Sequence, residues 1–159
     1  MSRSVTVRQF IEDSLIKQIE EIGKGTPFTY HAFALDSIAI EFLGKILAQR
    51  PSFDTKDTSG DDFKKAIEML FPDEYHKHSS FLYDQLRCGM LHFFGPKSKI
   101  ALGEEKNEGR NSHLTPDENG KLILVFEVFH DDFKKAAEKL FKLNYKNLDQ
   151  IFLVIDQKS

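Results

Sequence analysis

The sequence predicts a mainly α-helical chain with one domain over residues 1–159. Apolar residues recur at three- and four-residue steps in four stretches before residue 95, and glycine or proline follows each stretch. Beyond residue 97 the pattern changes to short apolar runs around one turn signal, followed by a fifth amphipathic stretch. The expected fold is therefore four helices, then a small β-hairpin, then one or two C-terminal helices.

The first two helices are predicted over Val7–Ile22 and Tyr30–Leu47. Gly23, Gly25 and Pro27 end the first helix because glycine and proline do not continue a helix well. The second helix is apolar around most of its circumference, which is expected of a helix at the centre of a fold.

The third predicted helix covers Asp61–Phe71, after a polar loop that Pro51 opens, and it closes at Pro72. A charged connection over residues 74–78 leads to the fourth helix, Ser80–Phe93. A Gly–Pro pair stops this fourth helix, so the helical part of the chain covers about residues 6–94.

Residues 97–126 are expected to form short strands and a hairpin. Lys97–Leu102 reads as a strand, and residues 103–111 read as a polar loop. His113–Leu114 and Lys121–Phe126 flank Asn119–Gly120, a pair that favours a type I′ hairpin turn.

The C-terminal part, residues 131–155, is predicted to be helical. Asp131–Leu143 places Phe133, Ala136 and Leu140 on one face of a fifth helix. Asn147–Ile155 fits both a strand and a helical stripe, and we interpret it as helix.

Composition limits the function. Cys88 is the only cysteine, so no intramolecular disulfide and no cysteine-based zinc site are expected. The polar N-terminus and the lack of an apolar run of about 20 residues predict a cytoplasmic protein without a membrane span. The net charge of −3 argues against a broad grip on duplex DNA but allows a local phosphate site. Glycine-rich phosphate loops and serine-hydrolase motifs are also absent from the sequence, and no cofactor is implied.

The fourth helix carries the most informative residues. Gly89 costs about 1 kcal/mol inside a helix, which predicts close approach of another backbone or a ligand. Arg87 is bracketed by Tyr83, Met90 and Phe94 at helical spacing, so its guanidinium should lie at a contact surface. A partly buried arginine needs a carboxylate, a phosphate or water.

Arg87 and His92 are five residues apart, about 140° around a helix and about 7.5 Å along it. A joint site therefore needs either a loosened helix after Leu91 or a second copy of the helix across a two-fold axis. His92 lies in the last turn, where the helix dipole favours its protonated form.

The segment Leu86–His92, with arginine and histidine separated by four residues, resembles the signature helix of the HEPN (higher eukaryotes and prokaryotes nucleotide-binding) superfamily. The resemblance covers about residues 6–94 and implies a four-helix, up-and-down bundle to which the C-terminal part is an appendage. It also implies a homodimer through the Ser80–Phe93 helix. Active members are metal-independent endoribonucleases, and the resemblance implies RNA or nucleotide binding, in phage defence or a toxin–antitoxin pair.

This resemblance assigns roles to residues of the helix. His92 would transfer protons and Arg87 would hold two phosphoryl oxygens, which suits RNA cleavage without a metal. The candidate substrate-binding residues around them are Tyr83, Cys88, Lys97 and Lys99. The position after the arginine is usually polar in active members, whereas here it is Cys88.

Other interpretations stay open. Arg87 can pair with an acidic residue while His92 caps its own helix, which makes the chain a non-catalytic dimer whose hairpin region His113–Phe126 contacts a protein partner. Cys88 and His92, four residues apart, could form a thiol site. His76 and His78 could bind a metal, although a solvated surface is the favoured interpretation.

Overall fold

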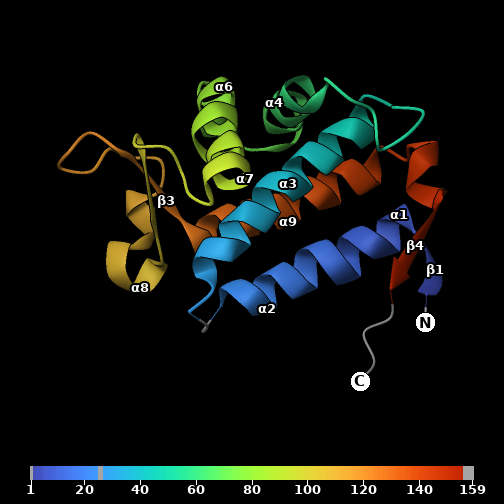
Figure 1. Ribbon diagram of the computed structural model, residues 1–159, viewed down its shortest axis with the longest axis horizontal. Coiled ribbons are helices and arrows are strands. Elements are labelled where there is room, and N and C mark those ends of the chain that lie inside the picture. Colours follow the sequence, from blue (N-terminus) through green and yellow to red (C-terminus); the bar gives the residue numbers. More distant parts are fainter. Residues whose placement is uncertain (1, 25–26, 156–159) are drawn as a thin grey trace.

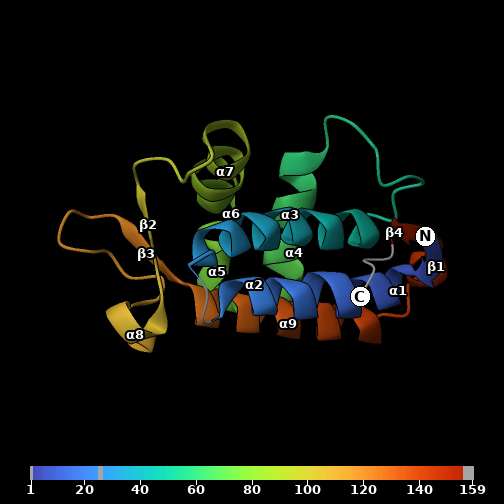
Figure 2. The ribbon, with the colours of Figure 1, turned by 60° about the horizontal axis from the view of Figure 1, so that its bottom comes forward.

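The computed structural model describes residues 2–24 and 27–155, and it confirms the mainly helical class. The N-terminal helix, α3 (Thr29–Leu47) and α9 (Phe126–Lys142) run alongside one another along the length of the molecule. Helix α4 (Ser59–Leu70) and the helix that ends in α7 stand across them (Figures 1 and 2). The β-structure lies at the two ends of this helical body.

The N-terminal helix is continuous from Val7 to Gly23 and consists of α1 (Val7–Phe10), a π-helical stretch (Ile11–Gln18) and α2 (Ile19–Gly23). Thr6 and Gln9 form a capping box at its start, each side chain bonding the backbone N–H of the other. The predicted first helix is thereby confirmed.

Helix α3 is the central helix that its apolar circumference predicts. It packs against the N-terminal helix, α4 and α9. Gly44 allows α4 to approach, because a Cβ at this position would lie 1.7 Å from the backbone oxygen of Asp62. Between α4 and the next helix, the expected connection contains the short helix α5 (Asp73–His76), which buries Tyr75 completely.

The predicted fourth helix is confirmed as one run from Ser79 to Phe93. It comprises α6 (Ser79–Leu82), a π-helical stretch (Tyr83–Cys88) and α7 (Gly89–Phe93). Phe94 ends it in the left-handed conformation, with φ of 53°. Arg87 therefore lies within a π-helical turn, a widened geometry that often marks functional sites.

The strand expected near residues 97–102 is present as β2 (Ile100–Gly103). Its partner is β3 (Leu122–Val125), and the two strands are parallel. The prediction of a polar loop over residues 103–111 is wrong, because α8 (Glu105–Glu108) and a 3₁₀ turn (Arg110–Ser112) form the crossover that parallel strands require.

A narrow hairpin is present where the sequence predicts one. The backbone N–H of Leu114 donates to the carbonyl of Ile123, and Pro116 forms an antiparallel bridge with Leu122. The prediction of a type I′ turn is wrong. Such a turn needs positive φ at both Asn119 and Gly120, and only Gly120 has it. The carboxylate of Asp117 shapes this turn by accepting two backbone N–H groups instead.

The C-terminal part is not the appendage that was expected. Helix α9 begins five residues earlier than predicted, and its inward face joins the central core. The buried residues of this face are Phe126, Phe129, His130, Asp132, Phe133, Ala136, Ala137 and Leu140. The N-terminal helices and α9 thus share one hydrophobic core.

The helical interpretation of the last segment is wrong. A 3₁₀ turn (Lys146–Asp149) precedes the strand β4 (Ile151–Ile155), which pairs antiparallel with β1 (Ser2–Thr6). The sequence pattern of this segment fits both a strand and a helix. Pairing with β1, from the opposite end of the chain, makes it a strand.

Candidate functional site

Arg87 forms an ion pair with Glu41 of α3. Its Nη2 lies 2.6 Å and its Nε 2.8 Å from the same carboxylate oxygen, Oε2. The side chains are only 14% and 9% exposed, so the pair is largely removed from water. This carboxylate is the acidic partner that one interpretation of Arg87 requires.

Lys45 lies on the other side of Glu41. Its Nζ is 3.7 Å from Glu41 Oε1 and donates to the backbone carbonyls of Phe53 and Thr55, at 2.9 and 3.3 Å. Glu41 therefore lies between two cations, and the three side chains carry one excess positive charge. The same contacts attach the loop before α4 to α3.

Tyr83 and Cys88 border this cluster. The guanidinium carbon of Arg87 lies 5.5 Å from the centre of the Tyr83 ring, a cation–π distance. Burial raises the pKa of Tyr83, with a smaller contribution from its contact with Cys88. Cys88 itself is half-buried.

His92 has a different environment, because it is exposed at the end of α7. Its neighbours in sequence are exposed as well: Leu91 is 40%, Phe93 71% and Phe94 86% accessible to solvent. The structure thus brings Arg87 together with Glu41, whereas it leaves His92 among apolar residues at the surface.

Lys97 and Lys99 follow the helix. Lys97 pairs with Asp84 at 2.5 Å, and its backbone N–H donates to the carbonyl of Gln85. The backbone N–H of Lys99 donates to the side-chain oxygen of Gln85, at 3.4 Å. These contacts place both lysines beside the helix Ser79–Phe93.

The turn before Lys97 explains Gly89. A Cβ at position 89 would lie 2.7 Å from the carbonyl oxygen of Gly95 and 2.8 Å from the nitrogen of Lys97. The predicted close approach at Gly89 is confirmed, and the approaching group is the chain's own backbone.

An exposed apolar surface extends from α7 onto α3. The hydroxyl of Tyr30 donates to the carbonyl of Phe94 at 2.8 Å and so joins the two helix ends. We define the apolar surface as the exposed residues of these two segments: Phe28, Tyr30, His31, Leu35, Ile38, Leu91, His92, Phe93 and Phe94. It contains no lysine, arginine, aspartate or glutamate.

Sequence reasoning missed a buried hydrogen-bond chain around Tyr75. The backbone N–H of Val125 donates to His113 Nδ1 at 3.0 Å, which leaves the proton of the neutral ring on Nε2. Nε2 lies 2.7 Å from the Tyr75 hydroxyl, which in turn donates to Asp132 at 2.8 Å. Burial lowers the pKa of His113 from 6.5 to about 4. These hydrogen bonds connect β3 to α5 and α9.

A second buried group joins α3, α9 and the π-helical stretch of the N-terminal helix. His130 Nδ1 lies 2.9 and 3.1 Å from the two oxygens of Asp36, and Nε2 donates to the carbonyl of Ile16. Both side chains are fully buried, and the ring of Phe126 stacks on the imidazole. Burial raises the pKa of Asp36. Neither histidine network has a local sequence signal, because its members come from distant segments.

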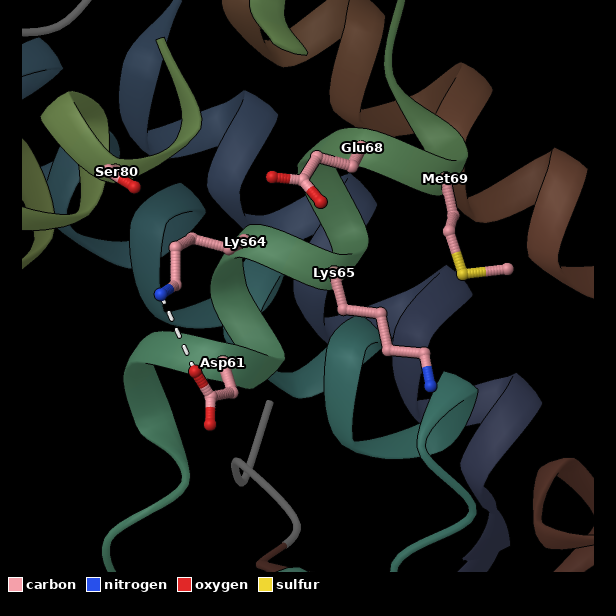
Figure 3. A pocket seen from close by; sticks show the side chains of 6 residues that line it. All are labelled: Asp61, Lys64, Lys65, Glu68, Met69 and Ser80. Carbon is pink, nitrogen blue, oxygen red and sulfur yellow. Dashed lines mark ion pairs between the residues drawn. The ribbon is translucent and has the colours of Figure 1, made fainter. Parts of the chain in front are cut away.

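An open polar cavity of about 420 Å³ lies between α4 and the start of α6 (Figure 3). Lys64 pairs with Asp61 at 3.4 Å at its rim, while Glu68 accepts a hydrogen bond from Ser79. The lining residues are Asp61, Lys64, Lys65, Glu68, Met69 and Ser80. Charges of both signs line it, so it favours no single class of ligand.

Within residues 2–24 and 27–155, no group of three or more His, Cys, Asp or Glu side chains could hold a metal ion. None of the helices in that part of the chain has the length and apolar character to cross a membrane. Comparisons of the chain with protein-family models, with curated proteins and with solved structures give no match.

Proposed function

We propose that this chain is a non-catalytic interaction module that self-associates through the apolar surface. The observation that carries the proposal is the exposure of Phe93 and Phe94, at 71% and 86%, next to the exposed stripe of α3. The hydrogen bond between Tyr30 and Phe94 brings the two segments together, and large apolar side chains exposed on adjoining segments typically mark a site of protein association.

The charge pattern favours a second copy of the chain as the partner. A two-fold contact buries the same patch on both copies, so a charged group near the axis would meet its own like charge. The apolar surface avoids this repulsion because its residues carry no fixed charge. The ion pair between Arg87 and Glu41 also agrees with a structural role for Arg87, because the carboxylate already neutralises the guanidinium.

The test is the mass of the chain in solution, measured by light scattering and sedimentation for the wild type and for Phe94→Asp. Aspartate tolerates the left-handed backbone at position 94, so the fold should persist while the dimer is lost. Leu143→Asp is the matched control, because Leu143 is also an exposed apolar residue but lies at the end of α9. A monomeric wild type, or a Phe94→Asp variant that stays dimeric, would overturn the proposal.

A second candidate is a HEPN-like ribonuclease or RNA-binding domain that uses Arg87 and His92. It is favoured by the position of His92 within the apolar surface, because association there would gather two imidazoles near one axis. The excess positive charge of the Lys45–Glu41–Arg87 cluster would attract a phosphate.

Purified protein incubated with structured RNA, with and without a chelator, tests this candidate. Cleavage that persists with chelator, disappears in His92→Ala and survives in the control His76→Ala would establish it. Cleavage unaffected by His92→Ala would remove the mechanism. RNA binding without cleavage would leave a binding role for the site.

A further inference from the structure

The tip of the hairpin carries an asparagine followed directly by a glycine, and this turn projects from one end of the molecule beside β3 (Figures 1 and 2). Asn119 and Gly120 are both exposed. Among the described residues, none forms a hydrogen bond with the carboxamide of Asn119. A Cβ at position 120 would meet nothing within 4 Å. The surroundings therefore leave the carboxamide carbon of Asn119 open to attack by the backbone nitrogen that follows it.

Asp117 holds this turn closed. Its Oδ1 accepts the backbone N–H groups of Asn119 and Lys121, each at 2.8 Å. The backbone N–H of Asp117 donates to the carbonyl of Lys121 at 2.8 Å, and its carbonyl accepts the N–H of Gly120 at 3.0 Å. In the closed turn, the Gly120 nitrogen therefore keeps its proton in a hydrogen bond and is not available as a nucleophile.

We propose that Asn119 is a site of spontaneous deamidation, and that opening of the turn held by Asp117 sets the rate of the reaction. Asparagine is one of the thermolabile residues of proteins. Gly120 opposes ring closure least of all residues, because it has no Cβ and its backbone is conformationally permissive. Exposed loop tips also open more readily than strands and helices. The site shares no residue with the apolar surface, so the proposal is independent of self-association.

The reaction uses water as its only co-reactant. In the opened turn the Gly120 nitrogen loses its proton to hydroxide and forms a bond to Cγ of Asn119. The Cγ–Nδ2 bond breaks, and the departing nitrogen takes a proton from water and leaves as ammonia, which regenerates hydroxide. Water then adds to one of the two carbonyl carbons of the cyclic imide and cleaves the bond from that carbon to the ring nitrogen. Cleavage at Cγ gives aspartate, and cleavage at the backbone carbonyl gives isoaspartate.

The carboxylate of Asp117 is the part of the turn that a substitution can remove. Asp117→Ala deletes two of the hydrogen bonds that keep the turn closed, so deamidation should accelerate about tenfold, equivalent to about 1.4 kcal/mol. Asp117→Asn keeps an acceptor oxygen and should react at close to the wild-type rate. Glu118→Ala is the matched control. It also removes a negative charge beside Asn119, but within the described part of the chain Glu118 forms no hydrogen bond, so the rate should not rise.

Peptide mass spectrometry measures the reaction after the folded protein has been incubated in mildly alkaline buffer made with heavy-oxygen water. Conversion at position 119 should incorporate heavy oxygen, and isoaspartate can be distinguished from aspartate by enzymatic methylation. Asn111 is an internal reference, because it is also exposed but is followed by serine. Far-UV circular dichroism shows that each variant stays folded, and Asn119→Gln should remove the modification from this peptide.

Each unfavourable outcome contradicts a specific part of the proposal. If Asn119 survives as long as Asn111 in the wild type, the site itself is refuted. If Asp117→Ala reacts no faster than the wild type, the turn does not control the reaction. If Glu118→Ala accelerates it as much as Asp117→Ala does, local charge and not turn opening determines the rate.

Discussion

The stability of this fold should depend on the protonation of His113, and replacement by asparagine tests this dependence. His113 Nδ1 accepts the N–H of Val125, and its Nε2 faces the Tyr75 hydroxyl in the closed chain that ends at Asp132. A protonated ring would lose its acceptor at Nδ1. Burial and the nearby charge of Arg110 oppose protonation, while Asp132 favours it, and the pKa falls to about 4.

The magnitude follows from the difference between the two states. In the unfolded chain His113 takes up a proton near its ordinary value of 6.5, whereas in the folded chain it stays neutral until about pH 4. Between these limits the unfolded state binds more protons, so the free energy of unfolding decreases by about 1.4 kcal/mol per pH unit as pH falls. The total loss by about pH 4 is about 3 kcal/mol.

Urea unfolding at a series of pH values measures this effect in the wild type and in His113→Asn. Asparagine keeps an acceptor near Nδ1 but does not titrate, so the stability advantage of the wild type over the variant should shrink by about 3 kcal/mol from pH 7.5 to pH 4. His76→Asn, at a half-exposed histidine, is the control and should show no such change. Parallel curves for the wild type and His113→Asn would refute the reasoning.

Two further substitutions test the packing of the helix Ser79–Phe93. Gly89→Ala should lower the free energy of unfolding by about 1–3 kcal/mol, because its Cβ would meet the Gly95 carbonyl, and denaturant midpoints will show this; an unchanged midpoint would mean that the turn moves freely. Arg87→Met should lower the free energy of unfolding by about 3 kcal/mol, because it leaves the buried Glu41 with Lys45 as its only cationic partner. In a double-mutant cycle, combining it with Glu41→Gln should recover part of that loss. Additive losses would show that Arg87 and Glu41 are not coupled.

The helices could be predicted from the sequence because each carries an apolar stripe that repeats with the helical period. The close approach at Gly89 could also be predicted, since a glycine there is costly unless something lies against it. For Arg87 the kind of partner could be stated but not its identity. Glu41 lies on a helix whose apolar circumference gave no sign that a carboxylate faces another helix.

Long-range contacts account for what sequence reasoning missed. The parallel pairing of β2 with β3 depends on a crossover of helical turns, while the local turn signal at Asn119–Gly120 points only to a hairpin. No local pattern indicates the roles of His113 and His130, because their hydrogen-bond partners come from segments far away in sequence. Apolar periodicity indicates which face is buried and contains no information about such polar partners.

The pairing of β1 with β4 also makes the chain amenable to rearrangement of its connectivity. Ser2 and Ile155 are opposite one another in the register, and directly opposed residues of antiparallel strands have Cα atoms only about 5 Å apart. A short peptide could therefore join the two strands, and the exposed turn at Asn119–Gly120 offers a place to open the backbone. A circularly permuted chain of that kind would have its new ends beside β3. Labels or fusion partners attached there would lie well away from β1 and β4.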